Sequence, residues 1–290
     1  NQISAAAFPT ATTLAGGGGD DTLEGGMVTD QLTGDGGTDR VVQVADANQV
    51  LTDSSLTGIA AGDFLTSIER ASLSGGASAN TINASAFSNP VSLAGLGGSD
   101  SLVGTPGADS LDAGAGSDTL DRNADENMAL TSSLFTSAGT GSDSIAGYEA
   151  ASLTGGSSAN LLDASGFGGQ VTLSGGVGDD TRLGAAGSDL LQGSFDTDRV
   201  VQEAGAQTLN DTLLSGDGND TLLLVERASL TGSGSGEAID ASAFTAGPVP
   251  IGGANGADTL SGGAAPDPPS RRDGGEPPRR TVFDFWVGEA

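Results

Sequence analysis

Cysteine, histidine and lysine are all missing from this sequence, and each absence excludes a class of chemistry. Without cysteine there is no disulfide framework. Without histidine or cysteine there is no Ser-His or Cys-His nucleophile system and no usual zinc site. Without lysine there is no P-loop lysine. No apolar run approaches the roughly 20 residues that span a bilayer. We therefore expect neither an enzyme nor a transmembrane segment.

Basic residues are also scarce, since the chain of 290 residues has only 10 arginines against 38 acidic residues and a net charge of −28. This charge excludes nucleic acid as a partner, because phosphate neutralisation needs basic patches, and it argues against docking on an anionic membrane. Two interpretations of an acidic, glycine-rich chain with few aromatic residues are disorder and a repetitive structure neutralised by bound metal. The periodicity of the sequence favours the second.

The longer of two periods spans about 80 residues. Three nearly identical stretches begin at Glu69, Glu149 and Glu226, and each leads into an Ala-Ser-x-Phe segment. The segment Asn1 to Phe8 matches Asn80 to Phe87, so the chain opens inside a unit, as a fragment or processed product of a longer array would. We expect the four recurring phenylalanines to be core residues: Phe8, Phe87, Phe167 and Phe244.

The shorter period is nine residues, in three tandem nonamers per block over residues 16–42, 95–121 and 175–201. The sixth position of every nonamer is aspartate: Asp21, Asp30, Asp39, Asp100, Asp109, Asp118, Asp180, Asp189 and Asp198. Glycine-rich positions ahead of it suit a tight turn that needs positive φ. The last three residues suit a short strand with one inward apolar side chain, which must stack on neighbouring coils to form a core.

These nonamers resemble the repeats-in-toxin (RTX), or haemolysin-type, calcium-binding nonapeptide Gly-Gly-x-Gly-x-Asp-x-apolar-x. The resemblance implies an all-β fold, a parallel β-roll or β-solenoid with calcium-binding glycine-rich turns. It also implies that two nonamers form one coil, so that turns alternate between two edges. Val28 departs from the pattern at a fourth-position glycine, and Arg182 departs from it at an apolar eighth position.

On this resemblance, the first and third nonamers of a block lie on one edge, one coil apart. The expected pairs are Asp21 with Asp39, Asp100 with Asp118, and Asp180 with Asp198. Two carboxylates about 5 Å apart repel by roughly 3 kcal/mol at an effective dielectric of 20, and a shared Ca²⁺ reverses the sign. Calcium takes six to eight oxygens, which carboxylates and turn carbonyls supply. The alternative is that these aspartates only form and solubilise turns.

Further candidate ligands follow from the same pattern. The middle aspartates Asp30, Asp109 and Asp189 would lie on the opposite edge and pair with less regular coils. Degenerate copies of the nonamer add four more candidates: Asp63, Asp143, Asp220 and Asp258. Copies with Asn80 and Asn160 at the sixth position are expected to be structural coils without calcium, and Glu237 is left undecided.

The remaining segments indicate two regions. Residues 1–263 form the solenoid, in which the stretches after Asp39 and Asp198 are expected to be longer strands. Their arginines, with Arg122, either brace the preceding aspartate or are solvated. Residues 264–290 form a tail rich in proline and arginine that ends in an aromatic strand, Val282 to Val287, either a type I secretion signal or a cap over the last coil.

The sequence therefore predicts a secreted calcium-binding protein that acts as a structural or adhesive extracellular scaffold, in a surface layer, filament or matrix. The expected partners are several calcium ions and other copies of the chain. The alternative is a C-terminal secretion and folding module of a larger toxin, protease or lipase. The expected location is extracellular or on a bacterial cell surface, because low cytosolic calcium would keep the chain unfolded for export.

Overall fold

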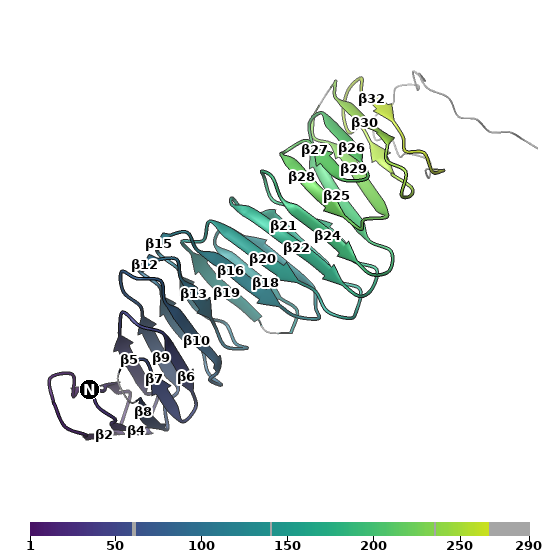
Figure 1. Cartoon of the computed structure of the whole chain (residues 1–290). Coiled ribbons are helices and arrows are strands. Elements are labelled where there is room, and N and C mark those ends of the chain that lie inside the picture. The colour runs from purple at the N-terminus through teal and green to yellow at the C-terminus, as the bar shows by residue number, and fades with distance from the viewer. Residues whose placement is uncertain (60–61, 140, 235, 267–290) are drawn as a thin grey trace, which may run out of the picture.

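The computed structural model describes residues 1–59, 62–139, 141–234 and 236–266. Within these ranges every regular element is a β-strand. The strands stack into an elongated rod, with the N-terminus at one end and the last strands at the other (Figure 1). The search for a helix long and apolar enough to cross a membrane finds none in this part of the chain.

The rod has two layers. One layer is a long sheet that runs the whole length of the rod: β1 (Gln2–Ser4), β3 (Thr22–Glu24), β5 (Arg40–Val44), β9 (Arg70–Ser74), β11 (Val91–Ala94), β14 (Ser110–Asp112), β19 (Gly141–Ala146), β18 (Leu134–Ser137), β17 (Met128–Thr131), β21 (Leu161–Gly166), β23 (Thr181–Leu183), β25 (Arg199–Ala204), β29 (Arg227–Gly232) and β31 (Ile251–Gly252).

The second layer is divided between two sheets. The N-terminal one contains β13 (Ser101–Val103), β10 (Thr81–Ala86), β6 (Gln49–Thr52), β7 (Ser55–Thr57), β8 (Asp63–Thr66), β4 (Gln31–Gly36) and β2 (Thr13–Gly18). The C-terminal one contains β16 (Thr119–Asn123), β20 (Ala150–Thr154), β22 (Gln170–Gly176), β24 (Leu190–Ser194), β28 (Asn219–Leu223), β27 (Leu213–Ser215), β26 (Gln207–Asn210), β30 (Ala238–Ala243) and β32 (Thr259–Ser261). A small sheet joins β12 (Gly97–Gly98) to β15 (Ala115–Gly116).

The register of the parallel strands has the period of two nonamers. Thr13 lies beside Gln31 in one layer, and Thr22 lies beside Arg40 in the other. Both partners are two nonamers further along the chain, and consecutive strands alternate between the layers. One coil therefore contains two nonamers, and the fold is the parallel β-roll predicted from the sequence.

Three coils are longer because each contains an antiparallel insertion. The insertions are β6–β8, β17–β19 and β26–β28, and the middle strand of each runs antiparallel to its neighbours. The stretches directly after Asp39 and Asp198 are longer strands, as predicted: β5 has 5 residues and β25 has 6. Beyond each of them the chain folds back twice within one layer and then rejoins the parallel register, as where Arg40 pairs with Arg70.

The interior is a ladder of the eighth-position side chains. All the apolar eighth positions of the nine tandem nonamers are buried: Leu23, Leu32, Val41, Leu102, Leu111, Leu120, Leu191 and Val200. Burying each contributes about 1.5–3 kcal/mol, which a three-residue strand gains only by stacking.

The recurring phenylalanines do not all behave alike. Phe87, Phe167 and Phe244 are buried as predicted, whereas the prediction for Phe8 is wrong because that ring is 56% exposed. Phe8 makes the same turn hydrogen bond, to the carbonyl of Ala5. It follows β1, the edge strand of the long sheet, so coils pack against this segment from one side only. The predicted tail segment Val282 to Val287 lies outside the described residues.

Candidate metal centre

Within each block the sixth-position aspartates lie on both edges of the rod, and by their hydrogen bonding they fall into two sets, called the first and second rows. The edge of each row changes from block to block, because Asp21 and Asp180 precede strands of the long sheet whereas Asp100 precedes β13 of the second layer. The first row contains the aspartates of the first and third nonamers: Asp21, Asp39, Asp100, Asp118, Asp180 and Asp198. The second row contains the middle aspartates with their partners on longer coils: Asp30 with Asp63, Asp109 with Asp143, and Asp189 with Asp220. All twelve residues are buried, although each carries a carboxyl group. Burial of so many acids requires compensation.

Hydrogen bonds connect the first row from coil to coil. The backbone N–H of Asp21 donates to Oδ1 of Asp39 at 2.8 Å. The same bond joins Asp100 to Asp118 at 2.6 Å and Asp180 to Asp198 at 3.1 Å. Each predicted pair therefore lies on adjacent coils of one edge, and one oxygen of the second carboxylate in each pair is engaged by the backbone.

Three glutamates extend this row, and the sequence analysis did not include them among the site residues. The N–H groups of Asp39, Asp118 and Asp198 donate to Oε2 of Glu69, Glu149 and Glu226. A signal for them was present, because these glutamates open the three copies of the long repeat. Their longer side chains take the place of a sixth-position aspartate after the antiparallel insertion.

The other carboxylate oxygen of the first row is left without a donor. Among the described residues, the buried Oδ2 atoms of all six first-row aspartates have no hydrogen-bond partner. A buried polar atom left in this state costs about 1–3 kcal/mol, and more when it is charged. Six equivalent orphaned oxygens at one position of a repeat point to a missing ligand of positive charge.

Glycine at the first position of the nonamer allows these oxygens to meet backbone carbonyls. A Cβ on Gly16 would lie 2.7 Å from Oδ2 of Asp21 and 2.7 Å from the carbonyl oxygen of Gly34 on the next coil. A Cβ on Gly95 would likewise collide with Oδ2 of Asp100 and the carbonyl of Ala113. Any side chain here would separate the two oxygens, so the glycine brings hard oxygen donors from two coils together.

The second row is chemically different, because both oxygens of its middle aspartates are already bonded. Oδ1 of Asp30 accepts the N–H of Thr12 at 2.7 Å, and its Oδ2 accepts the N–H of Gly26 at 2.6 Å. Asp109 and Asp189 make the same pair of backbone hydrogen bonds. These three side chains close their own turns, a role that the nonamer pattern does not separate from that of the first row.

Burial raises the pKa of several of these acids. It raises the pKa of Asp118, where the negative charges of Asp100 and Glu149 add to the effect. It also raises the pKa of Asp180 and Asp198. In the second row burial raises the pKa of Asp220 to about 7, and the nearby Asp189 contributes. At these four positions burial therefore disfavours the ionised carboxylate, which a bound cation would reverse.

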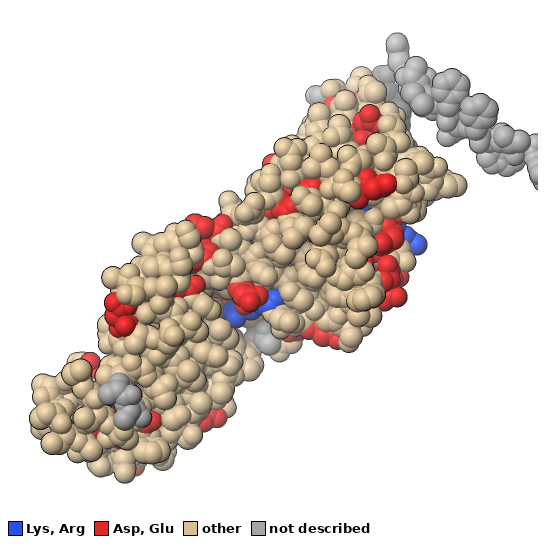
Figure 2. Space-filling model, in the orientation of Figure 1, with Lys and Arg blue, Asp and Glu red and all other residues tan. Residues whose placement is uncertain are grey.

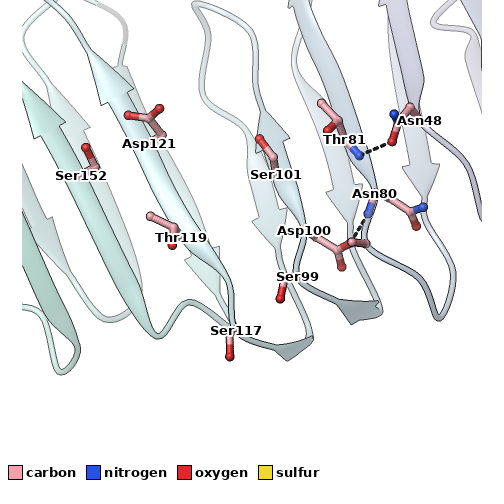
Figure 3. A pocket seen from close by; sticks show the side chains of 11 residues that line it. Asn48, Asn80, Thr81, Ser99, Asp100, Ser101, Ser117, Thr119, Asp121 and Ser152 are labelled. Carbon is pink, nitrogen blue, oxygen red and sulfur yellow. Dashed lines mark hydrogen bonds between the residues drawn. The ribbon is translucent and has the colours of Figure 1, made fainter.

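In the degenerate copies of the nonamer, sixth-position side chains accept hydrogen bonds from backbone N–H groups without a metal. Oδ1 of Asn80 accepts the N–H of Gly76, and the N–H of Asn80 donates to Asp100 at 2.7 Å (Figure 3). Asn160 is held in the same way by Gly156 and Asp180. Near the C-terminal end, Oδ1 of Asp258 accepts the N–H of Glu237.

The arginines next to the aspartates have different roles. Arg40 and Arg199 are exposed, as solvated side chains would be. Arg122 points inward and forms an ion pair with Asp143 at 2.7 Å, below the ring of Phe135. It therefore does not brace the aspartate before it, which was one of the two expectations. Asp143, a candidate ligand, already has a cation.

The first row fits calcium. Its free atoms are carboxylate and carbonyl oxygens, the ligands that Ca²⁺ prefers. Within the described part of the chain no group of three or more acidic side chains gathers at one point. The two carboxylates of a pair would therefore need turn carbonyls to complete a coordination shell, which the glycines make accessible.

The geometry defines a β-roll with acidic, glycine-lined turns, and comparison with known families agrees with it. Four copies of the RTX calcium-binding nonapeptide repeat are found, over residues 9–41, 94–128, 174–206 and 208–223. These four segments therefore match the RTX calcium-binding repeat, and such repeats imply Ca²⁺ as the ligand. No curated protein matches the chain.

Proposed function

We propose that the first-row aspartates bind several calcium ions between adjacent coils and that this binding folds the chain into an extracellular scaffold. The observation that carries the proposal is the set of six buried, unpaired Oδ2 atoms in the first row. At a net charge of −28 the metal-free chain repels itself, and ions that bind only the folded coils stabilise them by mass action.

A structural or adhesive role suits the shape and surface of the rod. Figure 1 shows one continuous, elongated stack of coils. In the view of Figure 2, acidic atoms lie in separate patches along the rod and basic atoms are few. Such a surface, bridged by calcium, is suited to assembly with further copies of the chain at the cell surface. We propose no enzymatic activity for it.

Calcium titration of the metal-free chain tests the core of the proposal. Far-ultraviolet circular dichroism should show a cooperative gain of β-structure with millimolar Ca²⁺. Magnesium should substitute poorly, because it keeps its waters and demands small octahedral sites. A spectrum unchanged by excess chelator would contradict calcium-dependent folding. Sedimentation velocity in calcium then tests the scaffold role, since a chain that stays monomeric at every concentration contradicts self-assembly.

A further inference from the structure

Arg182 departs from the repeat inside the core of the rod. It occupies the eighth position of the first nonamer in the third block, where the first and second blocks have Leu23 and Leu102. All three side chains are buried, and Arg182 has no exposed surface. In the long sheet it stacks between Leu162 and Val200. A guanidinium in this position needs nearby anions, because it is charged at any physiological pH.

Its head group reaches the first row of aspartates. Nη1 of Arg182 lies 3.2 Å from Oδ1 of Asp198. The two groups nearest to a Cβ built on Gly175 are Oδ2 of Asp180 and the same Nη1. The guanidinium therefore lies between the two aspartates of a first-row pair, at the glycine beside which Oδ2 of Asp180 lies.

The second block has oxygens where the third has this cation. At Gly95, the equivalent glycine, the nearest atoms are the carbonyl oxygen of Ala113 and Oδ2 of Asp100. The two blocks share the glycine, both aspartates and the coil-to-coil hydrogen bond. They differ in the residue at the eighth position, which supplies a positive charge in one block and a methyl group in the other.

We infer that Arg182 is a built-in counter-ion that replaces one calcium ion between Asp180 and Asp198. The inference rests on the proposed function for its account of the other pairs. A guanidinium already within the pair repels a second cation and occupies its space. The remaining unpaired donors of Arg182, Nε and Nη2, and the unpaired Oδ2 atoms of the two aspartates are all buried in the same region. A small shift of the guanidinium or of the carboxylates would bring these donors and acceptors within hydrogen-bond distance.

This arrangement makes one coil pair independent of calcium. The Asp21–Asp39 and Asp100–Asp118 pairs need an external ion, whereas the pair in the third block carries its own. In a stacked repeat protein, folding can begin at the most stable coils and propagate to their neighbours. The coils around Arg182 would therefore be the first to form as calcium rises and the last to open as it falls.

Counting bound ions tests the replacement. Calcium bound per full-length chain should be measured by equilibrium dialysis for the wild type and three variants. Arg182→Leu, which restores the residue of the other blocks, should bind one more ion than the wild type. Arg182→Lys keeps the charge and Arg199→Leu removes an exposed arginine, so neither should gain an ion. An Arg182→Leu chain that binds the same number as a calcium-binding wild type overturns the inference but leaves the proposed function standing.

Hydrogen exchange in chelator provides a readout that does not depend on calcium binding. Amides of β21 to β25 in the wild type should exchange more slowly than those of β2 to β5, and Arg182→Leu should remove this difference. Equal exchange in both regions of the wild type overturns the inference. A wild type that binds no calcium yet shows the protected third block overturns the proposed function alone.

Discussion

Replacing Asp100 with asparagine should have opposite effects on folding in the presence and absence of calcium. The amide oxygen of asparagine keeps one acceptor, but its nitrogen replaces the free Oδ2 and cannot bind a cation. At free calcium 100-fold above the dissociation constant, one site stabilises the fold by about 2.7 kcal/mol. We expect Asp100→Asn to lose about that amount in saturating calcium.

Without calcium the same substitution should favour folding. It removes one of two buried charges on adjacent coils, whose repulsion is at most about 3 kcal/mol at 5 Å and an effective dielectric of 20. Asp118→Asn should behave in the same way, because its Oδ1 can still accept the N–H of Asp100. The double variant should lose little more than either single variant in calcium, since one shared site is broken once.

Asp109→Asn is the matched control on the opposite edge. Its two oxygens accept the N–H groups of Val91 and Thr105, and asparagine can accept only one of these bonds. The expected loss is about 1–3 kcal/mol both with and without calcium. Circular dichroism provides both measurements: it follows urea unfolding in calcium, and it records the β-structure that remains in chelator. Additive losses for positions 100 and 118, or a loss at 109 that disappears in chelator, would refute this assignment of the two rows.

Three further outcomes follow from burial and geometry. In chelator the chain should be more stable at pH 5 than at pH 8, because a group such as Asp220, whose pKa is raised from 3.8 to about 7, contributes stability that is lost as pH rises; a flat urea midpoint would contradict this. Phe167→Ala should cost about 3–5 kcal/mol in saturating calcium. Phe8→Ala, at an exposed ring, should stay within about 0.5 kcal/mol by the same assay. Gly95→Ala should destabilise the fold by about 1–3 kcal/mol and remove one calcium site. Gly18 has open space around it, so Gly18→Ala should change neither the free energy of unfolding nor the number of bound ions.

The sequence was sufficient to predict the fold and the pairing of the first row because both depend on a local period. Nine residues are one turn and one short strand, and the resemblance to RTX repeats implied that two nonamers close a coil, so that each sixth-position residue returns to the same edge one coil later. That is why Asp180 and Asp198 could be paired without coordinates. The longer strands predicted directly after Asp39 and Asp198 are present as β5 and β25, but the antiparallel insertions that follow them have no such period, and the sequence did not reveal them.

Only the tertiary structure decided which oxygens remain free. Asp30 and Asp39 occupy the same position of the same repeat, yet one closes its own turn with both oxygens and the other keeps a buried Oδ2 without a donor. Both accept a backbone N–H from the neighbouring coil on Oδ1, and they differ in the N–H of Gly26, which reaches Oδ2 of Asp30 within its own turn, whereas Oδ2 of Asp39 has no such donor. The same holds for Arg182: the sequence marks it as a departure from the repeat, but only the stacking of coils brings its charge between two aspartates.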